Sequence, residues 1–235
     1  ADLARQFNAA AARIEALVKT HKSLLANASH ELRSPLTRIR MGLELMGGNQ
    51  PSPAFREEIL RNIAELDQLV DEILLASRLD AREADVGTVE LVDLIGLAAE
   101  ECARVDAELD VTAVPEGLEV RGVAKLLRRA LRNLLENARR YSQGDITVVL
   151  QRHDGQAQLS VLDRGPGVPP ALRERIFEPF YRLPGASERA GGVGLGLALV
   201  RSIAQRHNGS VRCEDQPDGS GGACFVLRLP LALTK

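Results

Sequence analysis

The first part of the chain carries apolar residues spaced alternately by three and four positions, the heptad pattern of a coiled coil or helical bundle. The pattern runs from Leu3 to Ala28, and His21 fills one position of it. After Ala28 the apolar residues shift to a new register that begins at Leu32, as if four residues had entered the repeat. The apolar residues of the new register are Leu32, Leu36, Ile39, Leu43 and Met46. One long helix is therefore predicted up to residue 46.

A second, shorter helix is predicted after the segment GGNQPSP, residues 47–53, whose glycine and proline end the first helix. Its apolar residues recur from Phe55 to about Leu79. At about 1.5 Å per residue the first helix is about 69 Å long and the second about 39 Å. Folded back antiparallel, the second helix covers only residues 21–46, so residues 1–20 need another partner. A second copy of the chain, which gives a dimeric four-helix bundle, is the simplest solution.

His30 lies away from this apolar stripe. It is two residues from both Ala28 and Leu32, so at about 100° per residue it lies roughly 200° round the helix from each. The side chain is therefore predicted to be exposed. Pro35 follows one turn later and removes a helical hydrogen bond, so the helix is expected to bend there.

Beyond residue 80 the pattern changes from long helices to short strands and helices. The polar segment DAREADVG, residues 80–87, is predicted to be a linker. Helices are expected at 91–105, 123–142 and 193–209, and strands at 108–114, 117–123, 210–216 and 222–230, with a hairpin at 145–165. The predicted domains are a coiled-coil lead-in at 1–20, a dimerisation and phosphoacceptor domain at 21–80, a linker at 81–87 and an α/β sandwich at 88–235.

Composition limits the kinds of partner and site that the chain can have, and the positions of two further histidines predict their roles. A net charge of −2 argues against a nucleic-acid or anionic-membrane surface. The three cysteines, Cys102, Cys213 and Cys224, form no C-x-x-C pair, which indicates reduced thiols rather than disulfides or a zinc site. His153, in a hairpin turn, is expected to be solvated. His207 is expected to be structural, as a cation at the end of a helix.

Two glycine-rich segments and one polar helix indicate a phosphate site. DRGPGVP, residues 163–169, follows a predicted strand, and GGVGLGLALV, residues 191–200, opens a predicted helix. Glycines before a helix let backbone N–H groups converge on phosphate oxygens. Neither segment is a Walker A loop, since no Gly-Lys-Ser/Thr follows. Asn133 and Asn137 share one face of another helix, where asparagine is disfavoured and where amide oxygens can ligate Mg²⁺.

Five motifs, in order and in spacing, resemble those of sensor histidine kinases. ASHELRSPLTRIR (28–40) resembles their H box and RNLLENARRYS (132–142) their N box. DRGPGVP and GGVGLGLALV resemble the two glycine boxes, and IFEPFYR (176–182) resembles the F box. The resemblance covers nearly the whole chain. It implies an α + α/β fold, in which an antiparallel helical hairpin forms a dimeric four-helix bundle and is followed by a Bergerat-type (GHKL) α/β sandwich that binds ATP.

The resemblance also implies roles for individual residues. His30 would be phosphorylated by ATP, and Glu31 would act as its general base. Asn137 would hold Mg²⁺, and Asp163 would accept the adenine amino group. Arg182 would stabilise the transferred phosphoryl group. The other residues assigned to nucleotide binding are Asn133, Arg140, Tyr141, Gly165, Gly167, Gly192, Gly194, Leu195 and Gly196.

Two of these positions depart from the commonest family pattern. Ser34 replaces the usual threonine and keeps the hydroxyl that orients a water for dephosphorylation of the partner protein. Arg140 replaces the usual lysine, which keeps the charge but changes its geometry. Residues 181–192, rich in glycine, serine and proline, would form a lid over ATP.

The implied activity is that of an ATP-dependent protein histidine kinase, which phosphorylates itself on His30 and passes the phosphoryl group to an aspartate of a response regulator. The implied cofactors are ATP and Mg²⁺. The implied partners are a second copy of the chain and a receiver domain, with no nucleic acid. The chain is expected to be linked to a membrane only through a sensor region of a longer parent protein. It would then be the cytoplasmic region of an inner-membrane sensor. The alternatives are a related ATPase, or a degenerate kinase that acts as a dimeric scaffold or phosphatase; phosphorylation in cis or in trans stays open.

Overall fold

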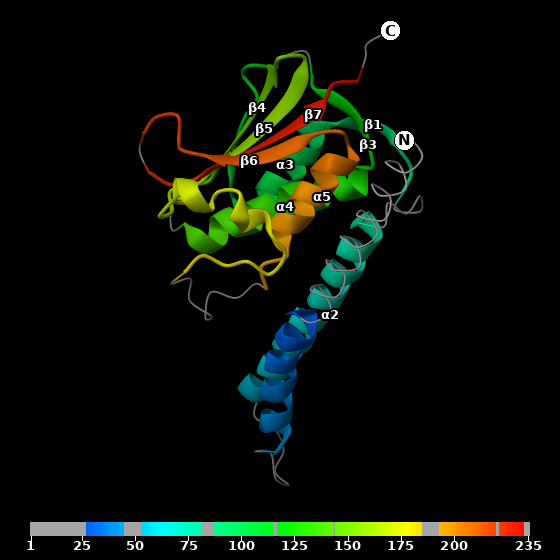
Figure 1. Cartoon of the computed structure of the whole chain (residues 1–235), viewed down its shortest axis with the longest axis vertical. Coiled ribbons are helices and arrows are strands. Elements are labelled where there is room, and N and C mark those ends of the chain that lie inside the picture. Colours follow the sequence, from blue (N-terminus) through cyan, green and yellow to red (C-terminus); the bar gives the residue numbers. More distant parts are fainter. Residues whose placement is uncertain are drawn as a thin grey trace, which may run out of the picture. The chain divides into compact units, whose positions relative to one another are not determined.

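The structure is a computed structural model, and it describes residues 27–44, 53–80, 87–114, 117–142, 144–184, 193–219 and 221–232. The chain divides into two compact units, Ala1–Asp80 and Ala81–Lys235 (Figure 1). The predicted lead-in at 1–20, His21, the loop at 47–52 and linker residues 81–86 lie outside the described residues.

The first unit is an antiparallel helical hairpin. Its first helix, called here the histidine helix, includes residues 27–44, and α2 spans Pro53–Asp80. Arg38 bonds to Asn62, and a Cβ on Gly42 would lie 2.5 Å from the ring of Phe55. Because positions later in the histidine helix meet positions earlier in α2, the two helices run in opposite directions. The predicted hairpin is confirmed.

The buried face of the histidine helix is not the one that the predicted shifted register indicates. Ala28, Pro35 and Gly42, spaced by seven, are buried. Leu36 and Leu43, which the shifted register placed in the seam, are 54% and 51% exposed. Within one chain, the seam therefore stays on the original heptad. The histidine helix continues through Pro35 as far as residue 44.

Apolar side chains remain uncovered on both helices of the hairpin. They are Leu36, Met41, Leu43, Leu60, Ile63, Val70 and Leu74. On α2, the buried apolar residues are Leu69, Ala76 and Leu79, whereas Ile63 and Val70 of the predicted stripe are exposed. The hairpin thus presents apolar surface beyond what its own two helices cover.

The second unit is built on a five-stranded mixed sheet with strand order β2-β4-β5-β7-β6. The strands are β2 (Glu108–Asp110), β4 (Thr147–His153), β5 (Gln156–Leu162), β6 (Ser210–Glu214) and β7 (Cys224–Pro230). β2 pairs parallel with β4, and the other pairs are antiparallel. A separate two-stranded sheet joins β1 (Glu90–Asp93) to β3 (Glu119–Gly122).

Three helices cover one side of the sheet (Figure 1). They are α3 (Leu94–Val105), α4 (Ala124–Tyr141) and α5 (Gly196–Arg206), and two short 3₁₀ helices, η1 (Pro170–Leu172) and η2 (Arg175–Phe177), follow β5. Alternate strand residues such as Val148, Leu150 and Phe225 are buried, together with Leu134 of α4 and Leu199 of α5. This is the predicted α/β sandwich, in which each strand buries one face against helices.

The predicted helix at 91–105 is wrong in its first three residues, which belong to β1. Asp93 caps α3, because its carboxylate accepts hydrogen bonds from the backbone N–H groups of Ile95 at 2.9 Å and Gly96 at 3.2 Å. A capping aspartate marks where a helix begins. The residues before it are therefore free to pair with β3.

A buried carboxylate fixes α3 to α4. Glu101 is 2% exposed and accepts two hydrogen bonds from Arg132, both at 2.9 Å, and one from Arg128 at 3.2 Å. The hydrogen bond from Arg132, joined by that from Arg128, lowers the pKa of Glu101 in spite of its burial. Glu101 is therefore ionised in the folded protein.

His207 is buried rather than a cation at a helix end. Burial lowers the pKa of its imidazole, so the ring is neutral near pH 7 and the predicted interaction with the helix dipole is wrong.

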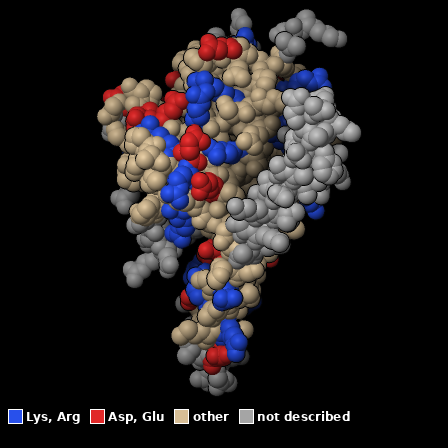
Figure 2. Space-filling model, viewed as in Figure 1, with Lys and Arg blue, Asp and Glu red and all other residues tan. Residues whose placement is uncertain are grey.

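The three cysteines are buried free thiols that form no disulfide bond. On the face shown in Figure 2, Lys and Arg side chains lie among Asp and Glu side chains. Within the described ranges, none of the helices has the length and apolar character needed to cross a bilayer.

Candidate functional site

Asp163, directly after β5, is the one carboxylate among the predicted nucleotide residues, and it is buried, at 3% exposure. Its Oδ1 accepts hydrogen bonds from the backbone N–H groups of Gly165 at 2.8 Å and Ala223 at 3.2 Å. No described residue donates to Oδ2. An ionised carboxylate only accepts hydrogen bonds, so Oδ2 can receive the amino group of a ligand.

The segment before β7 holds the Asp163 backbone in place. The Gln216 side-chain amide donates to the carbonyl oxygen of Asp163, and Gln216 is itself buried. Gly222 has a φ of +94°, and a Cβ there would overlap the same carbonyl oxygen. Sequence reasoning missed Gln216 and Gly222. The Gly221–Gly222 pair was the only local signal, and it has no motif around it.

The end of α4 forms the second wall of the site. The Ser142 hydroxyl accepts hydrogen bonds from the backbone N–H groups of Gly144 and Arg164, both at 3.1 Å. A Cβ on Gly165 would lie 2.6 Å from the carbonyl oxygen of Tyr141, so only glycine allows this approach. The first glycine segment therefore lies against the predicted residue Tyr141, which is half-buried.

Asn133 joins α4 to the start of α5. The side chain is 4% exposed, and its Nδ2 donates to the carbonyl oxygen of Gly196 at 3.1 Å. Asn137, one turn later, is half-buried, and no hydrogen bond from the described part of the chain reaches it. Its amide oxygen is therefore available to a ligand or metal. Arg140, a further turn on, is exposed.

In each glycine segment, one described glycine has a positive φ and lies against neighbouring backbone, a position that favours glycine. Gly167 has a φ of +73° and lies against Gly222. Gly194 has a φ of +78° and lies against the backbone of Phe180. Leu195 is fully buried, so its side chain belongs to the core and only its backbone can face a ligand. α5 begins at Gly196, and the first turn of a helix attracts phosphate.

The residues on this site fit an adenine nucleotide. α4, which carries the half-buried Asn137, contacts both β5, which leads to the buried Asp163, and α5, which begins at Gly196. Arg182 is half-buried just beyond Tyr181, whose ring carries the Arg175 guanidinium at 4.5 Å. Gly192 and lid residues 185–192 lie outside the described residues.

The residues predicted to serve phosphorylation and dephosphorylation, His30, Glu31 and Ser34, lie on the first unit. His30 is exposed, as predicted, and Glu31 beside it is half-buried. The Ser34 hydroxyl accepts a hydrogen bond from Nη1 of Arg38 at 3.3 Å. Arg38 also donates to Asn62 at 2.7 Å and to Glu65 at 2.8 Å. Local sequence patterns do not reveal this link, because Asn62 and Glu65 lie 24 and 27 residues from Arg38 along the chain.

Two family models match the chain. Residues 20–82 match the His Kinase A (phospho-acceptor) domain, and residues 122–233 match the histidine kinase-, DNA gyrase B-, and HSP90-like ATPase. The first match includes His30. The second includes Asn133, Asn137, Asp163 and both glycine segments.

Relatives with both regions are similar along most of the chain. Sensor histidine kinase CpxA of Escherichia coli (strain K12) is 36% identical over 231 residues, which is 96% of this chain and 50% of the relative. Signal transduction histidine-protein kinase/phosphatase MprB of Mycobacterium sp. (strain KMS) is 36% identical over 224 residues, 88% of this chain and 43% of the relative. The chain spans about half the length of these relatives.

Solved structures agree with the fold. A structure of the mycobacterial sensor histidine kinase MprB is 33% identical, with a TM-score of 0.53, and covers 61% of this chain and 98% of that one. The Acinetobacter baumannii histidine kinase AdeS shares the fold, with a TM-score of 0.70 over 86% of this chain and 98% of that one, at 22% identity. With a phosphoacceptor region, an ATPase region and relatives that join the two in the same order, the chain belongs to the sensor histidine kinases of two-component systems.

Proposed function

We propose that this chain is an ATP-dependent protein histidine kinase that is phosphorylated on His30 and passes the phosphoryl group to an aspartate of a response regulator. The observation that carries the proposal is an exposed histidine, His30, followed by the half-buried Glu31 on a helical hairpin, in the same chain as a candidate nucleotide site built around Asp163. A related ATPase would need no such histidine. A degenerate scaffold would need neither Oδ2 of Asp163 nor the Asn137 amide open to a ligand.

The nucleotide is held by groups with distinct tasks. Oδ2 of Asp163 accepts the adenine amino group, which favours adenine over guanine because guanine presents a carbonyl oxygen there. The glycine segments and the start of α5 receive the phosphates, beside Asn133, Arg140 and Tyr141. Asn137 would hold Mg²⁺, which keeps few protein ligands when it also binds phosphates. The bound metal would neutralise charge on the phosphoryl group in transfer.

The chemistry at the histidine is a displacement at phosphorus. An imidazole nitrogen of His30 bonds to the terminal phosphorus of ATP as the bond to the ADP oxygen breaks. Glu31 takes up the proton that the imidazole loses. Arg182 would stabilise the charge on the transferred group. The phosphoryl group then moves from His30 to a receiver aspartate.

A second activity is proposed for Ser34, whose hydroxyl would orient a water that hydrolyses the aspartyl phosphate of the response regulator. Support comes from MprB, which is named a kinase/phosphatase. Serine keeps the hydroxyl that this role needs.

The chain is proposed to work as a homodimer, with residues 21–80 forming half of a four-helix bundle. The uncovered apolar side chains of the hairpin support this, since burial against a second copy removes them from water. The domain limits 1–20, 21–80, 81–87 and 88–235 are kept as part of the proposal. Because the relatives are named sensor proteins of about twice this length, we also propose that the chain is the cytoplasmic part of a membrane sensor.

Labelling with ATP tests the kinase proposal directly. The purified chain, incubated with Mg²⁺ and ATP labelled at its terminal phosphate, is expected to gain a label that is acid-labile and base-stable. The label is expected to disappear in His30→Gln. A related ATPase would release phosphate without labelling the protein. An unlabelled wild-type chain would overturn the proposal.

A further inference from the structure

We infer that Arg38 is a positioning residue that holds the Ser34 hydroxyl in place for dephosphorylation of the response regulator. The inference rests on the proposed function, because Ser34 acts only if the chain removes phosphate from its partner. His30, Ser34 and Arg38 are spaced by four residues, so they follow one another along one side of the histidine helix. Arg38 is one turn beyond Ser34, and its Nη1 lies 3.3 Å from Ser34 Oγ.

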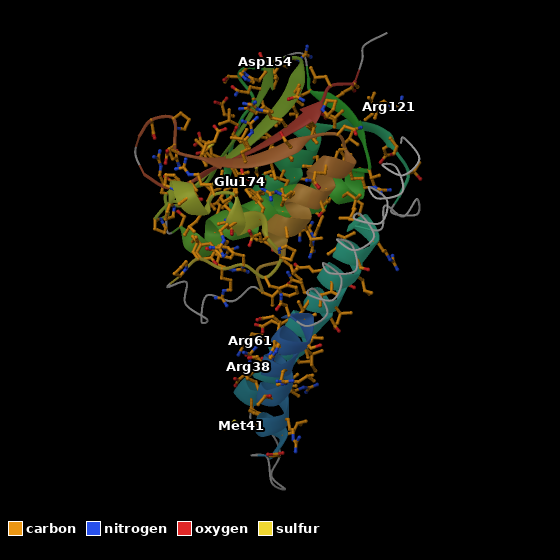
Figure 3. All side chains as sticks on the ribbon, in the orientation of Figure 1. Arg38, Met41, Arg61, Arg121, Asp154 and Glu174 are labelled. Atoms are coloured by element: carbon orange, nitrogen blue, oxygen red, sulfur yellow. The ribbon has the colours of Figure 1, made fainter. Side chains whose placement is uncertain are left out.

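The guanidinium of Arg38 is fixed by a separate acceptor at each of its three nitrogens. Nε donates to Asn62 Oδ1 at 2.7 Å, Nη2 to Glu65 Oε2 at 2.8 Å, and Nη1 to Ser34. The planar guanidinium presents donors in a rigid fork, so two strong contacts determine where the third nitrogen points. In Figure 3, Arg38 is labelled on the hairpin.

The main anchor of Arg38 is itself immobilised. Asn62 is 6% exposed, and its Nδ2 donates to the carbonyl oxygen of Glu58 at 2.8 Å. That bond determines which end of the amide faces Arg38, since nitrogen is used on one side and oxygen on the other. A buried, satisfied amide on α2 thus orients an arginine, and the arginine orients a hydroxyl one turn from His30.

The ion pair in this arrangement contributes little to stability, so its geometry is the more informative property. The Arg38–Glu65 pair has side-chain exposures of 48% and 62%. Exposed ion pairs contribute about 0–1 kcal/mol. The link between Arg38 and Ser34 is therefore better explained by what it does to the hydroxyl.

A serine hydroxyl has one hydrogen to donate and two lone pairs. Arg38 occupies one lone pair, which leaves the other to accept a hydrogen from an attacking water. In the proposed step, the water oxygen bonds to phosphorus as the bond between phosphorus and the aspartate oxygen breaks. A free aspartate carboxylate and inorganic phosphate result, and both hydrogens of the water stay with the phosphate. Arg38 restricts the hydroxyl to the orientation that this step needs.

A thiol at position 34 tests the contact without any partner protein. The three native thiols are buried, and burial raises their pKa values to about 11, 12 and 11, so in Ser34→Cys the new thiol alone reacts with iodoacetamide near neutral pH. With Arg38 beside it, that thiol is expected to have a pKa lower by about 0.5 than in Ser34→Cys with Arg38→Met, which is about threefold more thiolate.

The matched control for that measurement is Arg61→Met in the Ser34→Cys chain. Arg61 is exposed on α2 and forms no hydrogen bond or ion pair with the described residues, so the variant loses the same charge without losing the contact (Figure 3). Its thiol pKa is expected to match that of Ser34→Cys alone. Equal thiol pKa values with and without Arg38 would overturn the inference.

Comparing dephosphorylation with autophosphorylation distinguishes a positioning role of Arg38 from an effect on folding. The probe is a receiver domain loaded with acetyl phosphate, chosen from a panel as the one that the labelled chain phosphorylates fastest. Arg38→Met is expected to slow its dephosphorylation about tenfold, while autophosphorylation changes less than about twofold. Arg38→Lys keeps the charge but not the fork, and is expected to lose as much. In a Ser34→Ala chain, Arg38→Met is expected to cause no further loss.

The outcomes distinguish the two proposals. A wild-type chain that takes no label from ATP overturns the proposed kinase. Two results would overturn the role of Arg38 while the kinase proposal stands, provided that the chain takes label from ATP. One is an equal thiol pKa with and without Arg38. The other is an equal loss of phosphatase activity from Arg38→Met in the wild-type and Ser34→Ala backgrounds.

Discussion

The Nε2 atom of His207 accepts a hydrogen bond from the backbone N–H of Val123 at 3.0 Å. Its Nδ1 donates to the carbonyl oxygen of Ile203 at 2.7 Å, so the ring is neutral and carries its proton on Nδ1. Val123 precedes α4, and His207 ends α5. One imidazole therefore joins the helix of the two asparagines to the helix of the second glycine segment.

This contact predicts a loss of stability in mild acid. The ordinary pKa of histidine, 6.5, applies to the unfolded chain, whereas burial lowers the pKa of His207 in the folded state. As pH falls below about 6.5, the unfolded state binds more protons than the folded state, so the free energy of unfolding decreases. Urea denaturation at pH 7.5 and pH 5.5 measures the decrease. It is expected to persist in His153→Gln and to shrink in His207→Gln; an equal decrease in both would contradict it.

Removing the carboxylate of Glu101 is predicted to destabilise the second unit. Glu101→Gln leaves Arg132 and Arg128 without their buried anion, and breaking such a group costs roughly 2–3 kcal/mol when the cations keep some water. Glu100→Gln, at the neighbouring exposed position, is expected to cost less than about 1 kcal/mol. Chemical denaturation of the two variants compares them. A similar loss in both would mean that burial of Glu101 contributes nothing.

Nucleotide affinity is predicted to depend on both the carboxylate and the backbone of Asp163. Asp163→Asn is expected to weaken ATP binding about 10- to 100-fold, because a hydrogen bond to a charged group contributes about 1.5–3 kcal/mol. Gln216→Ala is expected to weaken it about fivefold, because the loop loses one neutral hydrogen bond. Isothermal titration gives both constants, and GTP binding, weaker from the outset, should change less. Unchanged ATP affinity in Asp163→Asn would refute the adenine contact.

Two adjacent glycines offer a matched test of the close approach to Asp163. Both have positive φ, +82° for Gly221 and +94° for Gly222, but only a Cβ on Gly222 would meet the Asp163 carbonyl, while one on Gly221 would have open space. Gly222→Ala is therefore expected to displace the Asp163 loop and abolish measurable ATP binding. Gly221→Ala is expected to lose only about 1 kcal/mol of stability. Equal ATP affinity in the two variants would argue against the approach.

The dimer proposal predicts different effects for two equally exposed leucines. Leu60 of α2 is 56% exposed and Leu91 of β1 is 57% exposed. Leu60→Glu is expected to convert the chain to a monomer, because a charge would have to be buried in the bundle. Leu91→Glu is expected to leave the dimer intact. Light scattering after size exclusion gives the mass; a monomeric wild-type chain would refute the bundle.

Periodicity located most of the elements, because each buries one stripe or face against a core. It failed at β1, where Leu91 and Val92 continue the apolar spacing of α3 although Asp93 begins the helix. It also placed Leu36 in the seam, whereas the structure buries the neighbouring Pro35 and exposes Leu36. Both residues are apolar, so spacing could not decide between them. Spacing shows that a face is apolar, but only a neighbour decides whether that face is covered.

The sequence by itself indicated which residues are candidates to accept phosphate, receive adenine or bind a metal, and it determined that His30 would lie away from the apolar stripe. The position of His30 follows from local spacing along one helix, and the other assignments follow from the resemblance of five short motifs to those of sensor histidine kinases. The tertiary structure alone decided that His207 is neutral, that Gln216 holds Asp163, and that Arg38 reaches both Ser34 and α2. Each depends on burial or on a partner distant in the sequence, and those set the protonation state and the free hydrogen-bonding atoms of a side chain.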